Sequence, residues 1–388
     1  MQAAERIKLF RESVIREMTR MAMQYDAINL SQGFPDFDPP MELKEAAAKA
    51  IMDGNNQYSP TWGYPALRQK LAEVFTERLG WPVDPMLNVT VTCGVTEAVN
   101  SAMLAMLNPG EEIIIIEPAH ENFIPSAIFA GAKPVAVPLE APGYRLDPER
   151  LDAAITPRTK AVLLNTPHNP TGRVFDAQEM AGFAEVVTRH NLVVITDEIY
   201  DHILYDGRQH VSPGSLEPLR DRTVTISGLS KTFAITGWRL GFAIAPTPLS
   251  AALRPVHDFL TVCAPTPLQV AGVTALNLPQ SYYDGMIADY HRRRDMMMGI
   301  LEEMNFTAPI PEGAYYVLAD YSQAPFPEAA WDSTTFAKWM VKEIGIAVVP
   351  GTVFYSIPGY GERSVRFAFP KRFETLEAAG DKLKQMQR

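Results

Sequence analysis

The chain of 388 residues is 47% hydrophobic, so it can bury a large core, and its length suggests roughly two or three structural units. Its formal net charge of −10 argues against a nucleic-acid partner, which would require a basic face. The two cysteines, Cys93 and Cys263, make neither a disulfide framework nor a metal cluster, and we expect both to stay reduced in the cytoplasm.

We expect no targeting segment and no membrane span. No apolar run approaches about 18 residues. The first segment mixes basic and acidic residues, namely Arg6, Lys8, Arg11, Arg16, Glu5, Glu12 and Glu17. It lacks the apolar region of a signal peptide, and its acids argue against a transit peptide, so it predicts an amphipathic surface helix. Residues 26–40, rich in Pro and Gly, predict an ordered but irregular arm.

The middle of the chain alternates short β-branched runs with helical stretches. These runs predict strands at 88–92, 112–116, 134–138, 160–165, 192–196, 223–227 and 240–245. The runs 113–116 and 193–195 are apolar on both faces, which is typical of strands buried between helix layers in a mostly parallel sheet. Ligands bind beyond the carboxyl ends of such strands, so residues that directly follow a strand are candidates for a site.

The C-terminal third predicts a different arrangement. Helices are expected at 280–304, 334–344 and 375–387, and strands at 314–320, 347–349 and 364–369. This order indicates a smaller α+β domain beside the large α/β domain. We therefore expect an N-terminal helix and arm over 1–40 that packs with the small domain, a large domain over 41–280 and a small domain over 281–388.

Lys231 stands out because it follows the strand 223–227 after a turn of small residues. A lysine amine can form a Schiff base with an aldehyde cofactor, and Arg239 is a good anchor for that cofactor's phosphate. The whole run 227–241 resembles the lysine-site signature of class I and II aminotransferases, which use pyridoxal 5′-phosphate (PLP). The resemblance implies PLP and makes Lys231 the Schiff-base lysine.

Two further strand ends carry polar residues that suit this cofactor. Asn169, after the strand 160–165, would donate its amide to the cofactor's phenolic oxygen, although the segment 165–172 also reads as an ordinary Pro-Gly turn. Asp197, after the strand 192–196, would hold the pyridine nitrogen protonated, and Tyr200 would share the phenolic oxygen. The alternative for Asp197 is a solvated helix N-terminus that it caps.

Two turns near the start of the large domain complete the predicted cofactor site. After the strand 88–92, Gly94 permits a tight turn, and the backbone N–H groups of Val95 and Thr96 open a helix that can bind phosphate. After the strand 112–116, His120 falls where a ring would stack on the cofactor, with an ordinary surface histidine as the alternative. His120 has no second histidine at metal-binding spacing, so no metal is expected.

Arg366 lies in an alternating strand of the small domain. A planar guanidinium binds a substrate α-carboxylate through two parallel hydrogen bonds. From the residues alone, a surface arginine would be the better interpretation.

The segments 29–37, 57–65 and 354–358 narrow the resemblance to the branch of kynurenine aminotransferase, glutamine transaminase K and methionine aminotransferase. By position this resemblance implies Arg366 at the substrate carboxylate with the Gly33 backbone beside it. It also implies that Tyr58 reaches the phosphate of a neighbouring subunit, so a homodimer with shared active sites is expected.

The chain also departs from the family pattern. Gly228 replaces a serine that contacts phosphate in many relatives, so Ser227 or Ser230 would take its place. The stacking residue is usually Phe, Tyr or Trp rather than His120. Residues 260–263 replace a Phe-His pair that helps to shape the aromatic substrate pocket of kynurenine-using members.

We therefore predict an aminotransferase that moves an amino group between an L-amino acid and a 2-oxo acid. No second arginine for a dicarboxylate side chain is evident in the sequence, which favours a neutral, apolar, aromatic or sulfur-bearing donor. The nearest alternative is a PLP-dependent β-lyase on cysteine conjugates or cystathionine. A PLP-binding sensor would need a DNA-binding module before the arm, and a nicotinamide dehydrogenase would need a G-x-G-x-x-G turn, which the chain lacks.

Overall fold

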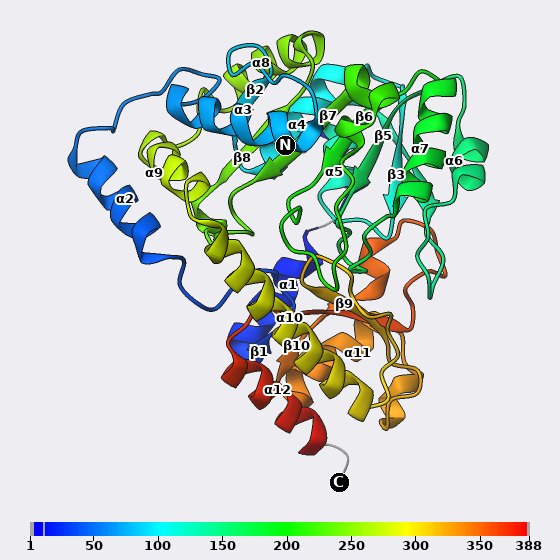
Figure 1. Ribbon diagram of the computed structural model, residues 1–388. Coiled ribbons are helices and arrows are strands. Elements are labelled where there is room, and N and C mark those ends of the chain that lie inside the picture. Colours follow the sequence, from blue (N-terminus) through cyan, green and yellow to red (C-terminus); the bar gives the residue numbers. More distant parts are fainter. Residues whose placement is uncertain (1–3, 11, 386–388) are drawn as a thin grey trace.

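The computed structural model describes residues 4–10 and 12–385. Within them, a seven-stranded sheet has the order β2-β8-β7-β6-β5-β3-β4 (Figure 1). The strands are β2 (Val89–Cys93), β3 (Glu112–Glu117), β4 (Lys133–Pro138), β5 (Thr159–Asn165), β6 (Val193–Asp197), β7 (Thr223–Gly228) and β8 (Leu240–Ile244). Among these strands only β8 runs opposite to the other six, which confirms the predicted strands and the mostly parallel sheet.

Helices cover both faces of this sheet. Successive side chains of a strand point to opposite faces, so Ile113 and Ile115 pack in one hydrophobic cluster while Ile114 and Ile116 pack in another. The first cluster draws on α4 (Val95–Met106), α5 (Phe123–Phe129) and α8 (Thr247–Thr261), and the second on α6 (Pro148–Ala154) and α7 (Ala177–Arg189). A strand buried on both sides has no polar face, which explains the apolar runs in the sequence.

At the edge of the sheet near β2 and β8, α3 (Pro65–Leu79) packs against β2, α9 (Thr266–Leu276) packs against β8, and α2 (Met41–Met52) packs on α9. Val91 and Phe242, from the two strands, share a cluster with Leu71 of α3 and Ala275 of α9. The loop that joins α2 to α3 lies against the beginning of α9, where the Thr266 hydroxyl donates to the carbonyl oxygen of Gln57 at 2.7 Å.

A second, smaller part follows the long helix α10 (Gln280–Glu303) (Figure 1). Its antiparallel sheet has the order β11-β12-β9, made of β9 (Tyr316–Asp320), β11 (Val349–Pro350) and β12 (Ser364–Ala368). The helices here are α11 (Ser333–Trp339), which continues as a π-helix over Met340–Ile344, and α12 (Phe373–Gln385). These elements confirm the smaller α+β domain. The predicted end of the last helix, 386–387, lies outside the described residues.

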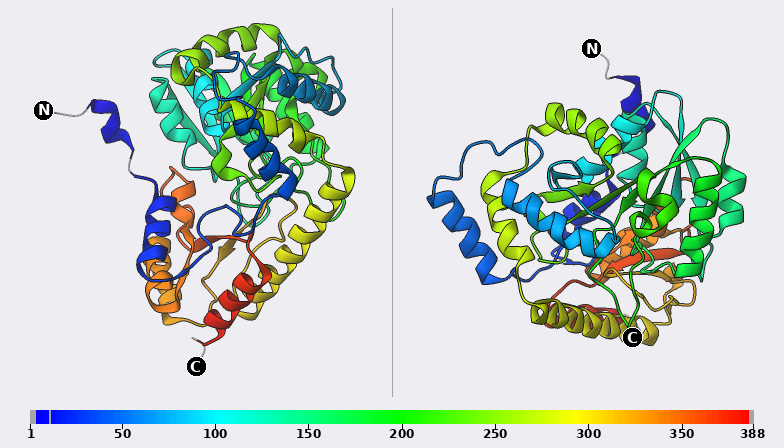
Figure 2. Two further views of the ribbon diagram at one scale, coloured as in Figure 1. Left: turned by 90° about the vertical axis from the view of Figure 1, so that its left-hand side faces the viewer. Right: turned by 45° about the horizontal axis from the view of Figure 1, so that its top comes forward.

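The N-terminal arm joins this smaller part. Strand β1 (Ile28–Asn29) pairs in parallel with β10 (Ile346–Ala347), and α1 (Val14–Gln24) packs beside them (Figure 2). The short predicted strand 347–349 is therefore divided between β10 and β11. The domain boundaries at 40 and 280 remain predictions.

The expected N-terminal helix is present as α1, but it does not extend over the first charged residues. The structure has a 3-10 helix over Glu5–Leu9 and starts α1 only at Val14. The Ser13 hydroxyl accepts the backbone N–H of Arg16 at 3.2 Å and so caps α1 at this point. The 3-10 helix buries none of its side chains and extends away from α1 (Figure 2).

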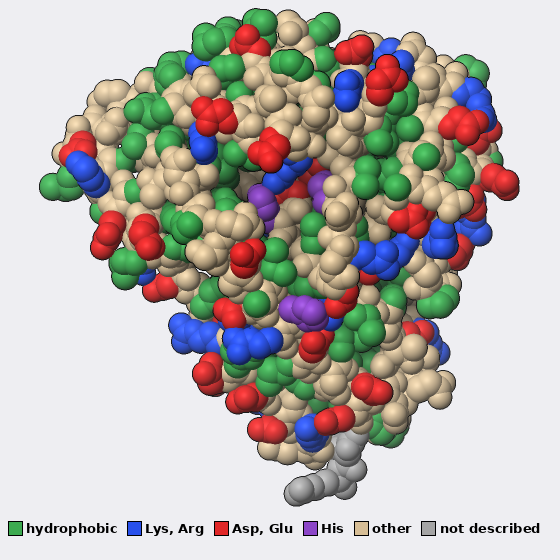
Figure 3. Space-filling view, viewed as in Figure 1, with side chains coloured by type: hydrophobic (Ala, Val, Ile, Leu, Met, Phe, Trp, Pro, Cys, Tyr) green, Lys and Arg blue, Asp and Glu red, His purple; other side chains and the backbone are tan. Residues whose placement is uncertain are grey.

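Charged side chains of both signs are interspersed over the face seen in Figure 3. No helix in the described part of the chain is long and apolar enough to cross a membrane. Two aromatic side chains are unusually exposed, Tyr58 at 81% and Phe259 at 92%. Tyr58 lies in the loop between α2 and α3, and Phe259 lies near the end of α8.

Candidate active site

A cavity of about 440 Å³ lies at the carboxyl edge of the large sheet, where the arm and β12 also contribute to its wall. It is lined by predicted site residues Gly33, Val95, Thr96, His120, Asn169, Asp197, Tyr200, Ser230, Lys231, Arg239 and Arg366. Two predicted residues, Ser227 and Tyr58, are not part of its wall.

Strand direction explains why these residues meet. The parallel strands β2, β5, β6 and β7 all end at the same edge of the sheet, so the turns that follow them are neighbours. The antiparallel strand β8 begins at that edge, so Arg239, directly before it, arrives at the same place.

The Lys231 amine points toward the N-terminal arm. Its Nζ donates to the carbonyl oxygen of Gly33 at 2.9 Å, and the Tyr315 hydroxyl donates to the same oxygen at 2.9 Å. Desolvation in the cavity lowers the pKa of Lys231 from its ordinary value. A larger fraction of neutral amine is then present near neutral pH, which suits a nucleophile or a proton acceptor.

Asp197 is the last residue of β6 and is 8% exposed. Its Oδ1 accepts the backbone N–H of Ile199 at 3.2 Å, so it does cap a turn, but a buried turn beside the cavity rather than a solvated helix. Burial raises the pKa of Asp197 to about 7, more than the hydrogen bond and the charge of Lys231 lower it. The carboxylate therefore requires a further cationic partner to stay ionised.

The turn after β2 brings together several hydrogen-bond donors that could hold an anion. Gly94 has a φ of 81°, and a Cβ on it would lie 2.5 Å from Nη2 of Arg239. A Cβ on Gly241 would lie 2.5 Å from the backbone nitrogen of Val95. The two glycines thus let the Arg239 guanidinium lie beside the first N–H groups of α4. A guanidinium and the N–H groups at a helix start are both donors that bind phosphate well.

The structure separates the two candidate serines. Ser230 lines the cavity, whereas the Ser227 hydroxyl donates to the carbonyl oxygen of Glu198 at 3.2 Å and to Asp201 at 3.1 Å. Ser227 therefore faces away from the anion site. A Cβ on Gly228 would lie 2.7 Å from the carbonyl oxygen of Leu240, so the pairing of β7 with β8 leaves little room for a side chain here.

Arg366 is 1% exposed, so the surface interpretation from the sequence is wrong. Its Nη1 donates to Oδ1 of Asn169 at 3.0 Å, and its Nη2 donates to the carbonyl oxygen of Ser31 at 2.6 Å. Its Nε has no hydrogen-bond partner among the described residues. A buried donor without an acceptor is unusual, and a ligand carboxylate would satisfy it. Because Asn169 uses its oxygen on Arg366, its amide N–H groups stay available to the cavity.

Tyr200 contacts a residue that the sequence did not reveal. Its hydroxyl lies 3.0 Å from the hydroxyl of Tyr316, and burial raises the pKa of Tyr200 well above its usual value. The Arg366 guanidinium stacks 4.3 Å from the centre of the Tyr316 ring. A Cβ on Gly33 would lie 1.8 Å from the Tyr316 hydroxyl oxygen, so the glycine lets the arm pass close to this ring. The sequence shows Tyr316 merely as an aromatic residue in a predicted strand.

His120 lies at the wall of the cavity, and its Nδ1 accepts the backbone N–H of Asn122 at 3.3 Å. Desolvation, together with the charges of Arg366, Lys231 and Arg16, lowers its pKa to about 3. The ring is therefore neutral at ordinary pH. Within the described residues, no group of His, Cys, Asp or Glu side chains could hold a metal ion.

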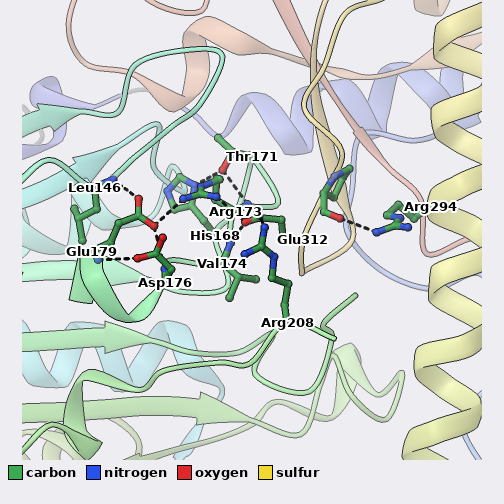
Figure 4. A network of polar contacts seen from close by, with 11 residues as sticks. Leu146, His168, Thr171, Arg173, Val174, Asp176, Glu179, Arg208, Arg294 and Glu312 are labelled. Carbon is green, nitrogen blue, oxygen red and sulfur yellow. Dashed lines mark hydrogen bonds and ion pairs between the residues drawn. The ribbon is translucent and has the colours of Figure 1, made fainter. Parts of the chain in front are cut away.

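The loop that carries Asn169 is fixed by a polar network (Figure 4). His168 shares a hydrogen bond of 2.7 Å with Thr171, and Arg173 bridges two carboxylates, Glu179 at 2.7 Å and Glu312 at 2.8 Å. Glu179 belongs to α7, and Glu312 belongs to the segment before β9. The network ties this loop to both parts of the molecule and so sets the position of Asn169 opposite Arg366.

Comparisons with known proteins agree with this geometry. The family described as aminotransferase class I and II matches residues 25–380. Methionine aminotransferase of Escherichia coli is 36% identical, with 96% of each chain covered. Kynurenine–oxoglutarate transaminase 1 of Homo sapiens is 37% identical, covering 95% of this chain and 94% of the relative. The solved structure of N-succinyldiaminopimelate aminotransferase from Mycobacterium tuberculosis superposes with a TM-score of 0.95 at 36% identity, over 99% of this chain and 100% of that one.

The fold and the arrangement of the cavity define an aminotransferase of fold type I. The chain belongs to the class I and II aminotransferase family. The predicted fold and enzyme class are thereby confirmed, and the relatives named above are aminotransferases rather than β-lyases.

Proposed function

We propose that this aminotransferase uses PLP to move an amino group between a neutral L-amino acid and a 2-oxo acid. One observation carries the proposal. Three unusual side chains line the same cavity. The Lys231 amine has a lowered pKa, and the buried Asp197 carboxylate lacks a sufficient cationic partner. The Arg366 guanidinium has an Nε without a hydrogen-bond partner among the described residues.

The residues fit the cofactor group by group. Arg239, Ser230 and the N–H groups of Val95 and Thr96 would hold its phosphate. A protonated pyridine nitrogen is the cation that Asp197 requires, and the Asn169 amide and Tyr200 hydroxyl would donate to the phenolic oxygen. His120 offers a neutral ring for stacking. Bound PLP supplies an aldehyde that bonds to amines and a ring that withdraws electrons from the substrate α-carbon.

The side chains of this chain then perform the proton chemistry and the orientation. The fork of Arg366 binds the substrate α-carboxylate and fixes the plane of the substrate, while Asp197 keeps the ring nitrogen protonated. The Lys231 amine removes the proton from the substrate α-carbon. A positioned general base contributes typically ~10²–10⁴-fold to the rate.

Several apolar side chains support a neutral amino donor. Ile15 and Phe34 line the cavity together with Tyr316, whose ring centre lies 4.3 Å from the Arg366 guanidinium. Relatives include a methionine aminotransferase and a kynurenine–oxoglutarate transaminase, and also an aspartate aminotransferase of Pyrococcus abyssi. The test is a panel of amino donors against several 2-oxo acids. Oxo-acid product supports the proposal, whereas pyruvate with ammonia and no amino transfer would favour a β-lyase.

We also propose a homodimer that shares its active sites, in the cytoplasm. Leu260 and Val262, 50% and 43% exposed, lie near Phe259 at the end of α8. The loop of Tyr58 is attached to α9 just beyond, because the backbone N–H of Ser59 donates to Thr266 at 3.0 Å. These apolar side chains would pack against a second copy, and Tyr58 would reach its phosphate. Free thiols at Cys93 and Cys263 suit a reducing compartment.

A mixed dimer tests the role of Tyr58. We combine Tyr58→Phe chains with Lys231→Ala chains and isolate the hybrid. If Tyr58 acts across the interface, one site of the hybrid carries both lesions and the other carries neither. Turnover per hybrid is then expected near half that of the wild-type dimer. If both sites instead show single-mutant turnover, Tyr58 acts within its own subunit.

Replacing Arg366 with lysine is expected to raise the KM for the amino acid strongly, by roughly tenfold or more, and to lower kcat. Lysine keeps the charge but loses the two-point fork that orients the carboxylate. Steady-state kinetics measure both constants. Arg363→Lys is the matched control, because Arg363 precedes the same strand, is exposed and does not line the cavity. Equal losses for amino acids and for amines without a carboxylate would contradict the assignment.

A further inference from the structure

Arg16 is an unpaired cation at the wall of the active-site cavity. It lies in the first turn of α1, is exposed, and has no ion-pair partner in the described part of the chain. Arg20, one turn further along the same helix, pairs with Glu12 at 2.7 Å. The positive end of the helix dipole lies at this first turn and disfavours a cation there. Helix stability therefore does not explain an arginine at position 16.

Arg16 lines the same cavity as Arg366 and Lys231, the two residues proposed to bind and convert the substrate. The charges of Arg366, Lys231 and Arg16 all act on the neutral His120 ring at the cavity wall. Gln32 and Asn122 add polar groups to this side of the cavity. Besides Arg239 at the turn after β2, the cavity therefore has two further guanidinium groups, one in β12 and one in α1.

One carboxylate, Glu121, also lines this side and must be considered. Its Oε1 accepts a hydrogen bond from the Ser13 hydroxyl, the same hydroxyl that caps α1. No ion pair joins Glu121 to Arg16 among the described residues. Glu121 is thus held at the end of the helix by Ser13, and the guanidinium of Arg16 stays available to a ligand anion.

We propose that Arg16 binds the distal carboxylate of a dicarboxylic 2-oxo acid, the amino acceptor, while Arg366 binds its α-carboxylate. This inference rests on the proposed transamination. Both substrates of a transaminase use the same cavity in turn, so the neutral donor must fit as well. An exposed arginine can turn its head group to solvent and leave its aliphatic stem against a neutral side chain. The enzyme would then pair a neutral donor with a dicarboxylic acceptor.

The test uses the cofactor-loaded enzyme with one neutral amino donor and two acceptors, 2-oxoglutarate and pyruvate. Arg16→Met keeps the stem and removes the charge. The ratio of kcat/KM for 2-oxoglutarate to that for pyruvate is expected to fall about tenfold or more, mainly through KM. Arg16→Lys should restore part of the ratio. Arg20→Met, on the same helix but outside the cavity, should leave the ratio unchanged.

Binding of unreactive acids provides a readout that does not depend on turnover. Isothermal titration of the loaded enzyme with glutarate and with butyrate measures the preference for a second carboxylate. We expect Arg16→Met to lose that preference. An unchanged preference, or an equal loss for both acids, overturns the role of Arg16. Absence of transamination by the wild-type enzyme with every pair would instead contradict the proposed function, and the glutarate titration would still test Arg16.

Discussion

Replacing Lys231 with alanine is expected to abolish transamination, with a loss of at least about 10³-fold. In the proposed mechanism, the substitution removes both the amine that would bond to the cofactor and the base that would take the substrate α-proton. The absorbance band of the lysine-bound cofactor should disappear as well, while PLP remains bound without a covalent link. Steady-state assays and absorbance spectra of the purified variant measure these losses.

Lys371 provides an internal control for this experiment. It is also buried, and burial lowers its pKa to about 8, but its Nζ donates to the carbonyl oxygen of Phe34 at 2.8 Å and it does not line the cavity. Borohydride reduction followed by peptide mapping should locate the cofactor adduct on Lys231 in the wild-type enzyme. An adduct on Lys371 or another lysine that persists in Lys231→Ala would contradict the assignment of Lys231 as the Schiff-base lysine.

Asp197→Asn is expected to lower turnover by roughly 10³-fold or more while the fold is retained. An amide cannot hold the pyridine nitrogen protonated, so the ring withdraws electrons less strongly from the substrate. Assays of a variant shown to bind PLP measure the effect. Near-normal turnover in such a variant would rule out this role for Asp197.

The raised pKa of Asp197 also predicts how stability of the cofactor-free protein depends on pH. Its pKa moves from 3.8 to about 7 on folding, so the folded state binds more protons than the unfolded state between these values. Ionisation of Asp197 in this window therefore lowers the stability of the wild-type protein. Because asparagine does not ionise, the free energy of unfolding of Asp197→Asn should increase relative to that of the wild type as the pH rises from 4 to 7. Thermal unfolding across that range measures the difference.

Asp201 is the contrasting case. This carboxylate is buried too, and burial by itself would raise its pKa. The pKa is nevertheless lowered, because the charge of its partner Arg78, the histidines His202 and His210 and the hydrogen bond from Ser227 together outweigh burial. Asp201→Asn should lower the melting temperature, because it leaves Arg78 without its partner. A stability gain for Asp197→Asn and a loss for Asp201→Asn would show that the two neighbouring carboxylates have different roles.

The part of the site that lies at strand ends could be predicted from the sequence. Asp197 and Lys231 each follow an apolar strand, and strand direction alone brings them to one edge of the sheet. Arg16 and Tyr316 could not be predicted, because they reach the cavity only when the two ends of the chain pack together. Tyr316 lies in an ordinary strand pattern, and Arg16 lies among alternating charges that read as a surface helix.

Local geometry sets a second limit on prediction. The sequence could not distinguish Ser227 from Ser230 as a phosphate ligand. Ser227 belongs to β7 and its hydroxyl is used by Glu198 and Asp201, whereas Ser230 follows the strand and lines the cavity, and both facts depend on three-dimensional packing. The burial of Arg366 could not be predicted from the sequence either, because it depends on a segment far away in the chain. Its strand alternates like a half-exposed one, but the arm covers its outer side, where Ser31 receives a hydrogen bond from Arg366.

The pairing of β1 with β10 has a consequence for biosynthesis. Ile28 leaves the ribosome early, but its partner Ile346 is made near the end of translation, at about 5–20 residues per second. Until then the arm with Gly33 has no strand to join, although the large sheet can already assemble. A nascent chain stopped before residue 346 would hold Lys231 and Asp197 at the sheet edge without the wall that completes the cavity.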